Sequence, residues 1–135
     1  MLSAFKSLSI VIAGIVIAGC SSTSSEQQRQ LTLLAANRAN LIASELPLEA
    51  GPLSIMRASS NGSTVEIMMV YNADAPGAKP VSQVLNNSIN TYCTNPDTKA
   101  NLEVGLSYRI KMRNSRGQLI TDEVVTLERC NLAAR

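Results

Sequence analysis

Apolar residues recur at helical spacing in two stretches of the chain. Residues 25–46 carry one such stripe, which ends at Pro47, on Leu31, Leu34, Ala35, Ala39, Ile42 and Leu46. A second stripe follows Pro80 and ends at Cys93, on Val81, Val84, Leu85, Ile89 and Tyr92. The sequence Asn95-Pro96-Asp97 begins a further short helix that Gly105 stops. We therefore expect two amphipathic helices and one short helix.

Extended segments alternate with these helices. Residues 53–58 and 64–71 flank Asn61-Gly62, a pair that favours positive φ, and predict a hairpin. Its second strand is partly apolar on both faces, which favours helices on both sides of the sheet. Residues 106–113 alternate strictly and pair with 118–127, where Asp122-Glu123-Val124-Val125 breaks the alternation and predicts a bulge. The expected fold is α+β, with an antiparallel sheet of four or five strands from two hairpins, flanked by helices.

The first nineteen residues form a separate apolar segment. Lys6 is their only charge, and residues 8–17 are all Leu, Ile, Val, Ala, Gly or Ser. This is the pattern of a signal peptide, since a spanning helix needs about 20 apolar residues. The sequence Ile17-Ala18-Gly19-Cys20 resembles a bacterial lipobox, so we expect cleavage before Cys20 and acylation of that residue. Ser21 resembles the residue that follows the cysteine in outer-membrane lipoproteins. The alternative is an unmodified cysteine in an ordinary secretory signal.

These features divide the chain into three parts. We expect a signal peptide over residues 1–19, an acylated flexible linker over 20–28 and a single domain over 29–135. An N-acyl chain and an S-diacylglycerol on Cys20 would give stable anchoring, because one acyl chain alone is marginal. We expect no other cofactor.

Two further cysteines, Cys93 and Cys130, form an even pair in a compartment where disulfides persist. A bond between them would contribute roughly 3–4 kcal/mol in the chain-entropy model. Two buried free thiols are the alternative.

Composition excludes most enzyme chemistry. The 135 residues include no His, so His-dependent nucleophile pairs, His bases and His-bearing zinc sites are absent. We expect no catalytic and no metal-binding residues. A net charge of +2 gives no reason to expect nucleic-acid binding. The cations in the row Arg109, Lys111 and Arg113 fit a solvated strand face.

Candidate partner-binding residues gather around the first helix and first hairpin. Met56 and Met68 suit an adaptable groove, and Val70 lies on the same strand face as Met68. Arg38 interrupts the apolar stripe of the first helix, where it either contacts a partner or lays its stem along the core edge. We expect an apolar groove here that orders a disordered partner segment.

Four segments carry a family resemblance when they are taken in order. They are Leu33-Leu34-Ala35-Ala36-Asn37-Arg38 running to Leu46-Pro47, Ser59-Ser60-Asn61-Gly62-Ser63-Thr64-Val65, Thr91-Tyr92-Cys93-Thr94-Asn95-Pro96 and Leu127-Glu128-Arg129-Cys130. With the lipobox and the two-cysteine pattern, the chain resembles the type II secretion pilotins of the AspS class, α+β lipoproteins distinct from the all-helical pilotins.

The resemblance implies a non-enzymatic adaptor at the outer membrane. Its lipid would carry it through the lipoprotein sorting machinery, and its domain, facing the periplasm, would bind the C-terminal region of a type II secretin and direct secretin assembly. The acylated and disulfide cysteines of the family match Cys20, Cys93 and Cys130. One alternative is a periplasmic lipoprotein that inhibits a hydrolase, and such an inhibitor would have a mostly-sheet fold. The other is a lipoprotein with a structural role in the envelope.

Overall fold

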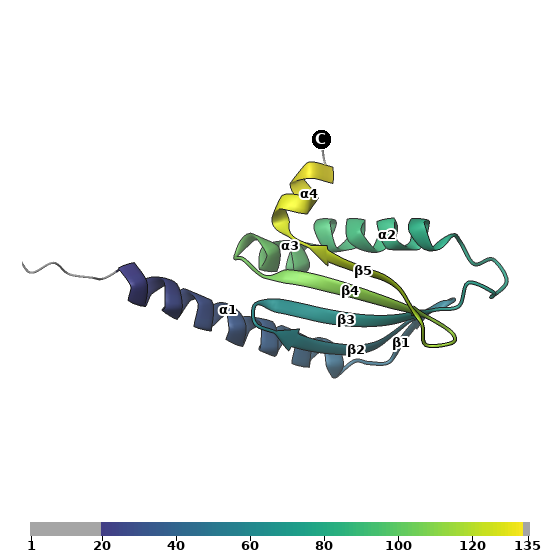
Figure 1. Ribbon diagram of the computed structural model, residues 1–135, viewed down its shortest axis with the longest axis horizontal. Helices are drawn as coiled ribbons and strands as arrows, with labels where there is room; N and C mark the ends of the chain where they lie inside the picture. Colours follow the sequence, from purple (N-terminus) through teal and green to yellow (C-terminus); the bar gives the residue numbers. More distant parts are fainter. Residues whose placement is uncertain (1–19, 134–135) are drawn as a thin grey trace, which may run out of the picture.

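The computed structural model describes residues 20–133, and the expected signal peptide lies outside the described residues. Four helices and five strands form a single α+β unit (Figure 1). In chain order they are α1 (Cys20–Ala43), β1 (Leu48–Ala50), β2 (Leu53–Asn61), β3 (Thr64–Tyr71), α2 (Val81–Thr94), α3 (Pro96–Glu103), β4 (Ser107–Asn114), β5 (Leu119–Val125) and α4 (Leu127–Ala133).

The strands form one sheet in the order β1-β2-β3-β4-β5. The α+β class and the five strands confirm the sequence prediction, but the sheet is mixed because β3 and β4 pair in parallel. Each hairpin is antiparallel, as expected. The expected all-antiparallel sheet is wrong because α2 and α3 carry the chain back to the end of the sheet where β3 began, so β4 runs beside β3 in the same direction.

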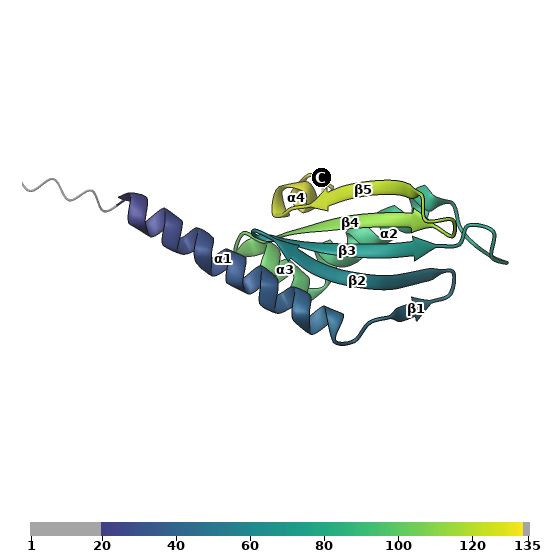
Figure 2. The same cartoon turned by 60° about the horizontal axis from the view of Figure 1, so that its bottom comes forward.

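All four helices pack on one face of the sheet. Alternate residues of β3 and β4 are buried, and they share one core with residues of α1, α2 and α3. Figure 2 shows the strands with α2 behind them. The expectation of helices on both sides is wrong because neighbouring side chains shelter the second face of β3. Met68 pairs in register with Arg57 and with Lys111, whose aliphatic stems flank it.

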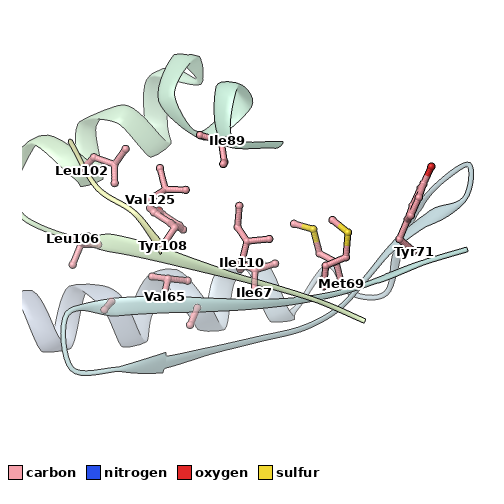
Figure 3. Packing of buried hydrophobic residues seen from close by; sticks show 13 residues of the cluster. Val65, Ile67, Met69, Tyr71, Ile89, Leu102, Leu106, Tyr108, Ile110 and Val125 are labelled. Carbon is pink, nitrogen blue, oxygen red and sulfur yellow. The ribbon is translucent and has the colours of Figure 1, made fainter. Parts of the chain in front are cut away.

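The core lies between the central strands and the helices. Figure 3 shows Ile67, Ile110 and Val125 extending from the strands toward Ile89 of α2. The α1 side contributes Ala35 and Ala39, both buried, whose small side chains allow this helix to lie close to the sheet.

Helix α1 begins earlier and ends earlier than the sequence indicates. Residues 23–28, which we expected to be flexible, are helical because they contain neither Gly nor Pro and continue a helix that is docked further along the chain. Arg29 pairs with Glu26 one turn away, and the Thr32 hydroxyl donates to the Gln28 carbonyl. The helix ends at Ala43 because Pro47 restricts the residue before it, so the last turn does not reach Leu46.

The bulge expected within residues 122–125 is elsewhere. The β4–β5 register shifts between Met112 and Arg113, which leaves Ile120 unpaired, while Asp122 to Val125 pair regularly. Alternation breaks at Glu123 because that residue lies on the helix side of the sheet, where its carboxylate accepts from Arg129 at 2.6 Å. A second bulge, which we did not expect, places Met56 between two pairs of the β2–β3 ladder.

Asn95 caps α3, and its loss should be measurable. Its Oδ1 accepts hydrogen bonds from the backbone N–H groups of Asp97 (3.0 Å) and Thr98 (3.2 Å), and Pro96 occupies the first helical turn. We expect Asn95→Ala to lower the free energy of unfolding by about 1 kcal/mol, measured by urea denaturation. Asn95→Asp keeps the acceptor and serves as control. A loss of equal size in both variants would contradict a capping role.

Tyr92 gives the fold a dependence on alkaline pH. Its ring lies 5.1 Å from that of Tyr108, and burial, with a smaller effect of Tyr108, raises the pKa of Tyr92 to about 12. Because the unfolded pKa is near 10, the stabilising effect is complete below pH 10 and is lost as pH rises toward 12. We expect a loss of up to about 2 kcal/mol over this range. Tyr92→Phe should flatten the profile, and an unchanged slope would refute the assignment.

Candidate partner-binding groove

A groove opens between α2 and the turn that joins β1 to β2. It is a cavity of about 350 Å³ that is open to solvent. Its lining comes from the β1–β2 turn, the end of β3, the loop before α2 and one side of α2, as Ala50, Pro52, Leu53, Tyr71, Gly77, Lys79, Val84, Asn87, Ser88 and Thr91. The size falls within the range of pockets that hold a small ligand or a few side chains of a partner.

The α2 wall presents residues at i, i+4 and i+7. Val84, Ser88 and Thr91 therefore lie on one side of the helix. The Ser88 hydroxyl donates to the Val84 carbonyl at 3.0 Å, and the Thr91 hydroxyl donates to the Asn87 carbonyl at 2.9 Å. Because these two hydroxyls are satisfied within the helix, they can contact apolar side chains without becoming unpaired donors.

The opposite wall and the floor are fixed by backbone contacts. Gly51 adopts φ +61° at the β1–β2 turn, and the Pro52 carbonyl accepts from the Asn72 amide at 2.9 Å. The Tyr71 side chain is buried, and its phenol donates to the Lys79 carbonyl at 2.5 Å, which ties the floor to the loop that enters α2. The groove is therefore a preformed, mainly apolar site.

A second cavity, of about 510 Å³, lies on the other side of α2 beside the disulfide. The bond between Cys93 and Cys130, with the Cα atoms 5.5 Å apart, confirms the predicted pairing. The lining of this cavity includes Asn86, Asn90, Thr94, Lys99 and Asn131.

The four residues proposed from sequence do not form one site. Met68 and Val70 lie on the open face of the sheet, where both are half-buried. Met56 is exposed at the bulge of β2, beside the pair of Arg57 with Met68. Arg38 is half-buried on α1, on the helix-covered side. The groove between α2 and the β1–β2 turn contains none of them.

Arg38 has one unusual feature. Its Nε atom is buried and has no hydrogen-bond partner among the described residues. A buried donor without a partner costs free energy, so an acceptor supplied at this position would be favoured.

The cations of β4 are partly exposed, in agreement with the solvated strand face that we expected, and two of them also form ion pairs. Arg109 contacts Asp122 at 2.6 Å and Glu66 at 3.5 Å, and Lys111 contacts Glu66 at 3.6 Å. The hydrogen bond from Arg109 holds the pKa of Asp122 below its ordinary value. Exposed pairs of this kind stabilise little.

The described residues offer no metal site and no spanning helix. Among residues 20–133, no three His, Cys, Asp or Glu side chains lie together in a way that could hold a metal ion. In the same part of the chain, no helix combines the length and apolar character needed to cross a membrane.

Sequence reasoning missed the residues that line the groove. Ser88 and Thr91 read as the polar side of an amphipathic helix, and Tyr71 reads as core. The sequence feature that could have indicated the groove is the set of turn residues Pro52, Gly77 and Pro80, which mark the turns between its walls.

Comparison with known proteins agrees with the fold. A family model described as "Type II secretion system (T2SS) pilotin, S protein" matches residues 27–130. The structure of the pilotin AspS from Vibrio cholerae has a TM-score of 0.74 and 58% identity, covering 78% of this chain and 97% of that one. The pilotin EpsS from Vibrio vulnificus has a TM-score of 0.75 and 53% identity, covering 78% and 96%.

A curated relative shows the same relationship at lower identity. "Pilotin AspS 2" from Escherichia coli O78:H11 (strain H10407 / ETEC) is 26% identical over 110 residues, which is 82% of this chain and 77% of that protein. Pilotins are not enzymes, in agreement with the absence of His-dependent chemistry from the sequence. The chain therefore belongs to the pilotins of the type II secretion system, in the AspS class.

Proposed function

We propose that this pilotin binds the C-terminal region of a type II secretin in the groove between α2 and the β1–β2 turn. The lipid on Cys20 would then direct the complex to the outer membrane through the lipoprotein sorting machinery, with the domain in the periplasm. The observation that carries the proposal is the groove itself, which has an apolar floor and an α2 wall whose hydroxyls are already satisfied.

A disordered secretin segment suits such a site. On binding it would order against Leu53 and Val84, and anchoring side chains would fill the cavity of about 350 Å³. Short apolar anchors in preformed pockets supply most of the binding energy in interfaces of this kind. The open sheet face around Met56, Met68 and Val70 remains a competing location for the same partner.

The helices weigh against a mostly-sheet hydrolase inhibitor, since α1 and α2 together span 38 of the described residues. A structural envelope role would require a different ligand, and no observation favours one.

Titration of the mature protein with a secretin peptide tests the proposal. The chain from Cys20, in mild detergent and with its disulfide intact, would be titrated by calorimetry with a peptide from the C-terminal end of the secretin of the same organism. We expect saturable one-to-one binding. Absence of binding well above about 10 μM would overturn the proposal, because a physiological adaptor should be mostly occupied at that concentration.

A further inference from the structure

Helix α2 separates the two cavities. Its residues at i, i+4 and i+7 on one side, Val84, Ser88 and Thr91, line the groove. Residues with the same spacing on the other side, Asn86, Asn90 and Cys93, line the cavity beside the disulfide. One helix is therefore both a wall of the groove and one end of the covalent link, and a shift of α2 changes both cavities.

Helix α2 rests on the core through partly buried side chains. Among its residues, all of which are described, only Ile89 is buried, and Val81, Val84, Leu85, Tyr92 and Cys93 are partly buried against the core. Its N-terminus begins after Pro80 without a side-chain capping bond and depends on the hydrogen bond from Tyr71 to Lys79. Near its C-terminus, Tyr92 packs against Tyr108 and Cys93 forms the disulfide. Among the described residues, the disulfide is thus the covalent restraint on this helix.

The other end of the link is fixed to the sheet. Cys130 lies in α4. A hydrogen bond from the Arg129 amide to the Thr126 hydroxyl, at 3.2 Å, stabilises the first turn of this helix. The Arg129 guanidinium pairs with Glu123 of β5 at 2.6 Å, and Leu127 packs against the core. Through α4, the disulfide connects α2 to the edge strand of the sheet.

We infer that the Cys93–Cys130 disulfide is a positioning link that sets the width of the groove, so that affinity for the partner depends on it. This inference rests on the proposed function. Without the link, only noncovalent contacts hold the C-terminal half of α2, so the distance from Ser88 and Thr91 to Ala50 and Leu53 is less tightly fixed. A preformed pocket becomes one that must be ordered on binding, which lowers affinity.

The double variant Cys93→Ala with Cys130→Ala tests the inference in the mature chain. We expect at least a 10-fold loss of affinity for the secretin peptide, together with amide hydrogen exchange that accelerates more in α2 than in β3 and β4, where faster exchange reflects only the lower global stability. Val65→Ala is the matched control, since it keeps the disulfide but removes core packing at the end of β3 opposite Tyr71. This control should lose stability and keep its affinity.

A second variant separates positioning from general stability. Cys93→Val with Cys130→Ala refills the space of the disulfide without a covalent link, so it remains usable if the first variant fails to fold. It should bind as weakly as the first. Wild-type affinity in either double variant, or an equal loss in Val65→Ala, would overturn the inference. A wild-type chain that does not bind would overturn the proposed function, while the exchange comparison still decides whether the disulfide fixes α2.

Discussion

Replacing Ala50 with tryptophan is expected to weaken binding of the secretin peptide by about 30-fold or more. Ala50 lies at the end of β1, is exposed and lines the groove beside Leu53. An indole at this position would occupy the space that a partner side chain needs, and loss of one well-packed anchor typically costs about 2 kcal/mol or more of binding energy. Calorimetric titration of the variant measures the loss. The fold should tolerate the change, because aromatic residues suit an edge strand.

The neighbouring position supplies the control. Glu49 pairs with Ser54, and because successive side chains of a strand alternate, it lies on the opposite face of the sheet from Ala50. Glu49→Trp introduces the same side chain outside the groove and should bind like wild type. Equal weakening in both variants would indicate a nonspecific effect.

Met68→Asp decides between the two locations proposed for the partner. Met68 lies on the open face, so its replacement leaves the groove between α2 and the β1–β2 turn unchanged. If Met68→Asp abolishes binding while Ala50→Trp does not, the partner binds the open face, as the methionine-rich hairpin originally suggested.

Local patterns in the sequence account for most of the elements. The helical stripes, the Asn-Gly turn and the strict alternation of β4 depend on spacing within one segment, and each corresponds to an observed helix or strand. The disulfide was also accessible, because two cysteines in an oxidising compartment leave few choices.

Contacts between segments that are distant in the sequence were harder to predict. The parallel pairing of β3 with β4 depends on where α2 and α3 return the chain, which no local pattern records. The bulge was misplaced because Glu123 breaks the alternation for a tertiary reason, its pairing with Arg129. Met68 reads as core but is sheltered by long neighbouring side chains, so the apolar pattern wrongly predicts helices on the second face of β3.

The candidate groove was hidden for a related reason. Its walls come from segments as far apart as Ala50 and Thr91, and its hydroxyl-bearing residues look solvent-exposed in a helical projection. Only the hydrogen bonds back to their own helix show that Ser88 and Thr91 can form an apolar wall. A binding surface made of such residues has no distinctive composition in the sequence.

The expected attachment to the membrane through Cys20 leads to the second prediction of a large effect. Helix α1 begins at Cys20, and residues 23–30 are exposed before Leu31, the first described residue of the helix that packs against the core. The sheet and the groove therefore belong to a part of the chain that does not itself need to contact lipid. If the acyl chains of Cys20 are the sole attachment, removing them should release the whole protein rather than weaken its hold.

In a chain whose residues 1–19 are replaced by a secretory signal that is cut without lipidation, Cys20→Ala should leave the protein in the soluble fraction of lysed cells and abolish incorporation of labelled palmitate. Three acyl chains on one residue anchor stably, whereas none leaves only weak surface contacts. Ser21→Ala keeps the acceptor cysteine and should fractionate like wild type. A Cys20→Ala protein that still sediments with membranes after a high-salt wash would show that the chain has another means of attachment and that lipidation is not what localises it.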